Sequence, residues 1–296
     1  MADGRRVTVA VTQMACGEDA AANVDRAEAL VREAAAAGAN IILLQELFET
    51  TYFCKTEHAR HLGLAKPFEG NPLVERFAAL ARELGVVLPV SFFERAGQAH
   101  FNSLAMVDAD GTVLGLYRKS HIPDGPGYEE KYYFSPGDTG FRVWDTAFGR
   151  LGVGICWDQW FPEAARAMAL KGAEILIYPT AIGSEPPSPG YDSQPHWETV
   201  MRGHAGANLM PLIAANRIGT EVSADGCAVT FYGSSFLADW TGQVVARASR
   251  DRQELLTASF DLDEIAGFRR GWGLFRDRRP DLYGALATLD GATRGG

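Results

Sequence analysis

Short apolar runs of strand length alternate with helical patterns in two parts of the chain. Residues 7–13 alternate apolar and polar side chains, and residues 20–37 carry an Ala-rich helical spacing that stops at Gly38. Residues 41–45 then form a short, almost wholly apolar run. The same order of strand, helix and strand recurs at residues 151–155, 162–170 and 175–178. Such β-α-β units predict an α/β fold in which helices cover buried strands.

Antiparallel hairpins are predicted between and after these two units. A turn signal at residues 108–111 separates two strand patterns, 103–107 and 112–117, as in a hairpin. The remaining patterns are helices at residues 72–84 and 196–209, and strands at residues 86–93, 211–215, 229–238, 243–248 and 255–260. Because no linker composition separates these segments, we expect residues 1–296 to form a single domain.

The cysteines and the net charge disfavour several classes of protein. The four cysteines lie far apart in the sequence, which argues against a zinc knuckle and a disulfide framework. We therefore expect a reducing, cytoplasmic location, and no apolar run has the length of a membrane span. The net charge of −9 disfavours nucleic acid and anionic membranes as partners and suits a small cationic substrate.

Two reactive side chains follow predicted strands, where open α/β sheets commonly build their sites. Glu46 ends the apolar run 41–45, and a poorly solvated carboxylate there can act as a general base. Lys119 follows the second hairpin strand, where an ammonium group can stabilise an oxyanion or a nearby thiolate. Taken singly, each has a simpler interpretation as a solvated surface charge.

Cys156 is the strongest single signal, because it lies between a buried strand and a predicted helix. Such a turn can expose the sulfur and direct backbone N–H groups at a substrate oxygen. The alternative is a buried structural cysteine, which is the role we expect for Cys16, Cys54 and Cys227.

Histidine is the usual base of cysteine hydrolases, so His121, His196 and His204 compete with Glu46 for this role. His121 is the best placed, two residues after Lys119. We favour capping, substrate contact or packing for all three. The spacing of His196 and His204 does not form the i, i+4 pair of a zinc-binding helix, so no metal site is expected.

In their order and local sequence, Glu46, Lys119 and Cys156 resemble the Glu-Lys-Cys triad of the nitrilase superfamily. The resemblance extends from residues 9–14 to residues 261–263. It implies a four-layer α-β-β-α sandwich and amidohydrolase activity without a metal or organic cofactor. It also implies a second site glutamate within residues 127–134, which we match to Glu130, the adjacent Glu129 being the alternative.

The segments 121–128, 156–163 and 204–208 resemble the branch of this superfamily that hydrolyses N-carbamoylputrescine. Relatives that bind a substrate carboxylate tend to place arginine shortly after the cysteine, where this chain has Asp158 and Gln159. The expected substrate is thus a carbamoylated amine with an ammonium end, which needs acidic or aromatic partners. We expect these side chains to contact it: Tyr52, His121, Trp157, Asp158, Glu185 and Asp192.

The resemblance implies that Glu46 takes the Cys156 proton and that an S-carbamoyl enzyme forms, while Lys119 stabilises the oxyanion. It further implies a homodimer or a larger homo-oligomer, with the tail from about residue 261 in subunit contacts. Two alternatives stay open. One is an amidase or ureidopropionase-like carbamoyl hydrolase of the same superfamily, and the other is a non-catalytic α/β binding protein in which Cys156 is structural.

Overall fold

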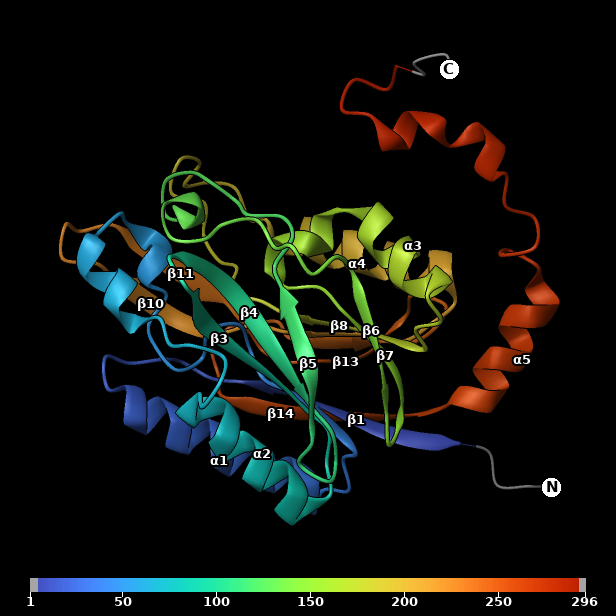
Figure 1. The fold of residues 1–296 in the computed structure, drawn as a ribbon, viewed down its shortest axis with the longest axis horizontal. Coiled ribbons are helices and arrows are strands. Elements are labelled where there is room, and N and C mark those ends of the chain that lie inside the picture. The colour runs from blue at the N-terminus through green and yellow to red at the C-terminus, as the bar shows by residue number, and fades with distance from the viewer. Residues whose placement is uncertain (1–4, 293–296) are drawn as a thin grey trace.

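Two β-sheets lie face to face, and a pair of helices covers the outer face of each (Figure 1). This computed structural model describes residues 5–292. The four layers confirm the α-β-β-α sandwich expected from the resemblance. The helices are α1 (Ala20–Ala36) and α2 (Pro72–Leu84) on one side, and α3 (Pro162–Leu170) and α4 (Gln194–Asn208) on the other.

The first sheet comprises β1 (Arg6–Gln13), β2 (Ile41–Leu43), β3 (Leu88–Ala96), β4 (Ala99–Val107), β5 (Val113–Arg118) and β14 (Glu254–Asp261). β1 pairs in parallel with β2 and antiparallel with β14. A bridge from Ile41 to Val87 joins this part to the antiparallel strands β3, β4 and β5. Glu46 and Lys119 follow β2 and β5, so both come from this sheet.

The second sheet comprises β6 (Arg142–Thr146), β7 (Gly149–Val153), β8 (Ile175–Pro179), β9 (Leu212–Ala215), β12 (Phe236–Ala238) and β13 (Val244–Arg247). Its central strands β7, β8 and β9 are parallel, as the second β-α-β unit predicts. β6, β12 and β13 add antiparallel edges. Cys156 follows β7, so the second sheet carries the candidate nucleophile.

Local sequence signals set the helix ends. The Asp19 side chain accepts the backbone N–H of Ala22 at the start of α1. Asn71 caps α2 in the same way, and Pro72 occupies its first turn. Gly85 ends α2 with φ 67°, a left-handed conformation that glycine adopts without strain.

Three apolar clusters fill the three interfaces between layers. Leu30 and Phe77 belong to the cluster between the first helix pair and its sheet. Val9 and Ile177 belong to the cluster between the two sheets, while Trp197 belongs to the cluster beneath α3 and α4. Strands buried on both faces are almost wholly apolar, which explains why their sequence pattern was easily recognised.

The predicted strand 229–238 was wrong in one respect, because the structure divides it into β11 (Ala228–Tyr232) and β12. Ser234 between them has φ 58°, which an extended strand cannot contain. β11 instead pairs with β10 (Ile218–Val222), a strand that the sequence analysis missed. It also missed β6, whose exposed polar residues hide its pairing with β7.

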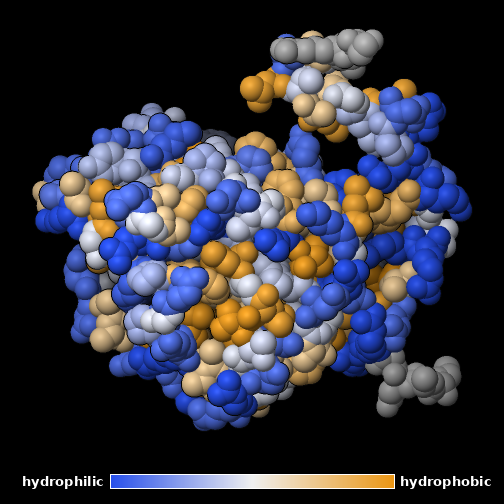
Figure 2. Space-filling model, in the orientation of Figure 1, coloured by the Kyte–Doolittle hydropathy of each residue, from blue (hydrophilic) through white to orange (hydrophobic). Residues whose placement is uncertain are grey.

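The chain after β14 continues as α5 (Leu262–Trp272) and then as two short turns that extend beyond the sandwich (Figure 1). Trp272, Leu282, Leu286 and Leu289 on this arm are exposed, and Figure 2 shows apolar atoms on it. No helix within residues 5–292 has the length and apolar character needed to cross a membrane.

Candidate active site

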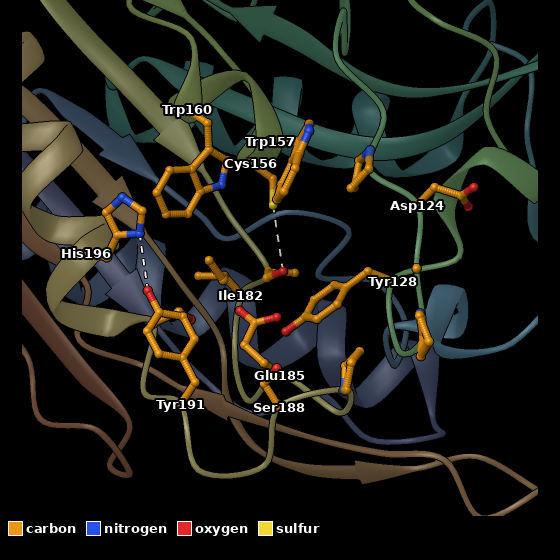
Figure 3. A pocket seen from close by; sticks show the side chains of 16 residues that line it. Asp124, Tyr128, Cys156, Trp157, Trp160, Ile182, Glu185, Ser188, Tyr191 and His196 are labelled. Atoms are coloured by element: carbon orange, nitrogen blue, oxygen red, sulfur yellow. Dashed lines mark hydrogen bonds between the residues drawn. The ribbon is translucent and has the colours of Figure 1, made fainter.

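The Cys156 side chain forms part of the wall of a cavity of about 550 Å³ (Figure 3). β7 ends just before it, and Cys156 opens a short 3-10 helix, Cys156–Trp160, with φ 44°. A non-glycine residue in this conformation is strained, as is common at functional turns. Gly154 permits the tight approach, since a Cβ there would lie 2.6 Å from the Tyr178 ring. The thiol donates to the carbonyl of Ala181 at 3.7 Å.

Glu46, Lys119 and Glu130 form a fully buried cluster. The Lys119 Nζ donates to Glu46 Oε1 at 2.9 Å and to Glu130 Oε2 at 2.6 Å. Asn102 donates to the same Glu46 oxygen at 2.6 Å. The other oxygen, Glu46 Oε2, is buried and has no hydrogen-bond partner among the described residues. A buried carboxylate oxygen without a partner is rare and is free to accept a proton.

Burial and the neighbouring charges shift the pKa values of Lys119 and Cys156. Burial alone lowers the pKa of Lys119, but Glu130 and Glu46 outweigh it and raise that pKa well above its usual value. Burial raises the pKa of the Cys156 thiol well above its usual range, and Glu46 raises it further, while Lys119 opposes both. The resting site therefore holds a neutral thiol and an ammonium, and the Glu46 oxygen that has no partner is available to a base-assisted cysteine nucleophile.

Glu130, and not Glu129, is the glutamate that belongs to this cluster. The Tyr52 hydroxyl donates to Glu130 Oε1 at 2.5 Å, and Lys119 binds its other oxygen. Glu129 is partly exposed and occupies the position before the short helix Glu130–Tyr132, without a side-chain capping hydrogen bond. Burial raises the pKa of Glu130 above its usual range, opposed by Lys119.

Two of the six expected substrate contacts line the cavity, namely Trp157 and Glu185. In Figure 3 the Glu185 carboxylate points into the space beneath Cys156, next to the Tyr128 hydroxyl, which binds the backbone of Gly183 and Ser184. Glu185 forms no ion pair within residues 5–292 and lies on the loop between β8 and α4. An unpaired carboxylate in a cavity wall is suited to an ammonium ligand.

Asp158 and His121, which were expected to contact the substrate, do not line the cavity. Asp158 is fully buried, and its Oδ2 accepts the Ile155 N–H at 2.9 Å and the Tyr117 hydroxyl at 2.6 Å. Its Oδ1 accepts the His121 N–H at 2.9 Å and lies 2.7 Å from the same residue's Nδ1. Asp158 thus joins the Cys156 turn to the segment around Lys119. With its ring also stacked on Phe161, His121 is badly placed as the base.

Tyr52 and Asp192 are also absent from the cavity wall. Tyr52 is fully buried and serves Glu130, as described above. Asp192 lies on the same loop as Glu185, but both of its oxygens accept Arg250 nitrogens at 2.8 Å. An ion pair with a residue distant in sequence is not visible in the composition of the loop, so the Arg250 partner of Asp192 could not be foreseen.

Asp124, Tyr128, Trp160 and Tyr191 are among the cavity-wall residues that were not predicted from the sequence. Asp124 lies at the rim with its carboxylate directed outward (Figure 3). Its position in the Pro-Asp-Gly-Pro turn that begins four residues after Lys119 could have indicated that it lies near the site. The cavity wall contains no lysine or arginine among the described residues. Within the same residues no group of three or more histidine, cysteine or acidic side chains could hold a metal.

Comparison with known proteins agrees with this geometry. The family model described as carbon-nitrogen hydrolase matches residues 8–270. The chain belongs to the carbon-nitrogen hydrolase family. The nitrilase-superfamily resemblance found in the sequence is thereby confirmed. The family and the geometry around Cys156 together identify the chain as a cysteine-dependent hydrolase of carbon–nitrogen bonds.

Relatives in this family match the chain over nearly its whole length. The N-carbamoylputrescine amidase of Solanum lycopersicum is 61% identical, with 97% of each chain covered. The citrullinase of Francisella tularensis subsp. tularensis is 55% identical, covering 94% of this chain and 96% of its own. A crystal structure of a carbon-nitrogen hydrolase from Helicobacter pylori G27 has 43% identity and a TM-score of 0.90, covering 96% of this chain and 99% of its own.

Proposed function

We propose that the chain hydrolyses N-carbamoylputrescine to putrescine, carbon dioxide and ammonia. The observation that carries the proposal is the composition of the cavity wall. Cys156 and the unpaired Glu185 both line the cavity, and no lysine or arginine does so among the described residues. The ureido carbonyl of the substrate would contact the Cys156 thiol, while the ammonium group at its other end would contact the Glu185 carboxylate. The name of the 61% identical tomato relative supports the same substrate.

Glu46, Lys119 and Cys156 carry out the chemistry in this proposal. Glu46 Oε2 takes the thiol proton, and the sulfur attacks the ureido carbonyl carbon. Lys119 and the backbone N–H of Trp157 stabilise the oxyanion, and the leaving amine departs with the proton that Glu46 held. Glu46 then deprotonates a water molecule, whose oxygen attacks the carbamoyl carbon. The carbon–sulfur bond breaks, the sulfur takes back the proton from Glu46, and the released carbamic acid decomposes to carbon dioxide and ammonia. Glu130 holds Lys119 in place throughout.

Citrulline is the second candidate substrate, because the Francisella relative is named a citrullinase. Citrulline carries the same ureido group but ends in an amino acid, so its carboxylate needs a cationic partner. The described cavity wall offers no lysine or arginine and places Glu185 inside. Like charges destabilise such a complex, which is why we place citrulline second.

The test is ammonia release from N-carbamoylputrescine, citrulline, N-carbamoyl-β-alanine and a simple aliphatic amide. We expect a strong preference for N-carbamoylputrescine and complete loss of activity in Cys156→Ser. Preference for citrulline or N-carbamoyl-β-alanine would overturn the substrate but leave the cysteine chemistry standing. No ammonia release from any of these substrates, in the wild type as in Cys156→Ser, would favour the non-catalytic binding protein, and equal non-zero rates would rule out Cys156 as the nucleophile.

We further propose a cytoplasmic homodimer or larger homo-oligomer. The described cysteines are all free, which suits a reducing compartment. Leu282 and Leu286 on the arm after α5 are 65% and 67% exposed, and apolar side chains on an extended arm need a surface to cover them. Light scattering of the wild type and of Leu286→Asp tests this. Equal masses of one subunit for both would refute it.

A further inference from the structure

Arg217 is a fully buried cation that the chemistry above does not use. It lies between β9 and β10, at the end of the second sheet, and reaches the loop after β2 of the first sheet. Its Nη2 donates to the carbonyls of Glu46 at 2.7 Å and Leu47 at 3.0 Å. Its Nη1 donates to the carbonyl of Thr50 at 3.3 Å. One guanidinium thus holds the backbone of the residue proposed as the base.

Glu221 of β10 completes this attachment. Its Oε1 accepts Arg217 Nη1 at 2.9 Å, and its Oε2 accepts Lys55 Nζ at 3.0 Å and the Tyr52 N–H at 2.6 Å. The rings of Tyr52 and Phe231 lie 5.8 Å and 5.3 Å from the guanidinium carbon. The loop is therefore anchored at the backbone of Glu46 and again at Tyr52, whose hydroxyl holds Glu130.

The neighbouring Asn216 makes a corresponding attachment on the side of the nucleophile. Its Oδ1 accepts the Ile182 N–H at 3.0 Å, and its Nδ2 donates to the Ile182 carbonyl at 2.9 Å. Ala181, directly before Ile182, supplies the carbonyl that accepts the Cys156 thiol. Two adjacent residues, Asn216 and Arg217, thereby fix the surroundings of both the base and the nucleophile to the end of β9.

A buried arginine is costly unless it makes contacts that a smaller or apolar residue cannot. Lysine would keep the charge but has no planar fork that spans several carbonyl oxygens. We infer that Arg217 is a positioning residue of the hydrolase, which keeps the unpartnered Glu46 carboxylate oxygen within reach of Cys156. This inference rests on the proposed role of Glu46 as the base.

The first experiment compares Arg217→Lys with Arg269→Lys. Arg269 on α5 is a matched control, because it also donates to backbone carbonyls, those of Leu209 and Ala173, away from the cavity. We expect Arg217→Lys to lower kcat by ~10–100-fold with little change in KM, since a displacement of about 1 Å can cost roughly 100-fold. Arg269→Lys should keep kcat. Unchanged kcat in Arg217→Lys, with only a lower Tm, would overturn the inference.

The second readout is the rate at which iodoacetamide alkylates Cys156 near neutral pH, with Glu46→Gln as the reference. Positioning predicts slower alkylation in both Arg217→Lys and Glu46→Gln and the wild-type rate in Arg269→Lys. If Glu46→Gln slows the alkylation and Arg217→Lys does not, the inference about Arg217 is overturned while the proposed role of Glu46 stands. An unchanged Glu46→Gln would instead refute the proposed base. If Arg217→Lys does not fold, the same two measurements, kcat and the rate of Cys156 alkylation, are made on Glu221→Gln. Its amide has only one oxygen, so it cannot accept hydrogen bonds from Lys55 and Tyr52 together with one from Arg217.

Discussion

Replacing Asp158 by asparagine tests whether this residue joins the Cys156 turn to the Lys119 segment or contacts the substrate. Each oxygen of the buried carboxylate accepts one backbone N–H, from Ile155 and from His121. Asparagine has only one oxygen, so in either orientation its amide group faces one of these N–H donors. An unsatisfied buried donor costs about 1–3 kcal/mol, and the remaining bonds lose their charge assistance, so we expect a loss of about 2–4 kcal/mol.

The assay is urea unfolding combined with steady-state kinetics. Asp192→Asn is the matched control, because it makes the same change in an exposed ion pair with Arg250, which is worth less than about 1 kcal/mol. We expect Asp158→Asn to lose stability and kcat together, since both Cys156 and Lys119 shift. A variant as stable as Asp192→Asn, with only KM raised, would refute this reasoning and restore Asp158 as a substrate contact.

Three further predictions follow from the site. Glu185→Gln should raise KM for N-carbamoylputrescine by roughly tenfold or more, the equivalent of one charge-assisted bond, without slowing Cys156 alkylation; equal KM values would contradict the ammonium site. Gly154→Ala should lower kcat by up to ~100-fold, because the added methyl meets the Tyr178 ring and displaces the Cys156 turn; full activity would show that the turn adapts. Burial raises the pKa of Glu130 from 4.5 to about 7, so the folded state holds this proton more tightly than the unfolded chain. The contribution of Glu130 to stability is present below pH 4.5 and is lost as the pH rises to about 7. In urea unfolding, the stability of the wild type relative to Glu130→Gln should therefore fall across that pH range. A stability difference that rises or stays flat with pH would refute this.

The parts of the fold that the sequence predicted are those whose signals are local. Apolar runs identified the central strands, and Gly38 marked the end of the first helix. Glu46, Lys119 and Cys156 were found because each lies within three residues of the end of a strand, where open α/β sheets build their sites. The edge strands β6 and β10 were missed, since polar residues on their exposed faces hide the pairing.

The substrate-contacting residues could not be predicted from sequence, because loop side chains acquire their partners only in the folded chain. Glu185 and Asp192 have the same chemistry and lie on one loop, yet one points into the cavity and the other binds Arg250. Asp158 was expected at the substrate because it neighbours the cysteine, but four hydrogen-bonding contacts direct it inward. Arg217 gave no signal, since a single arginine after a strand is usually solvated.

The division of the reactive groups between the two sheets makes the protein a natural candidate for fragment complementation. A fragment that ends before β6 carries Glu46 and Lys119 but no nucleophile, and the fragment that begins there carries Cys156 but no base. We expect neither fragment to be active by itself. On mixing, the two fragments would have to rebuild the apolar cluster between the sheets and the pairing of β14 with β1. The ammonia released after mixing would then measure the amount of reassembled protein, without any fluorescent or radioactive label.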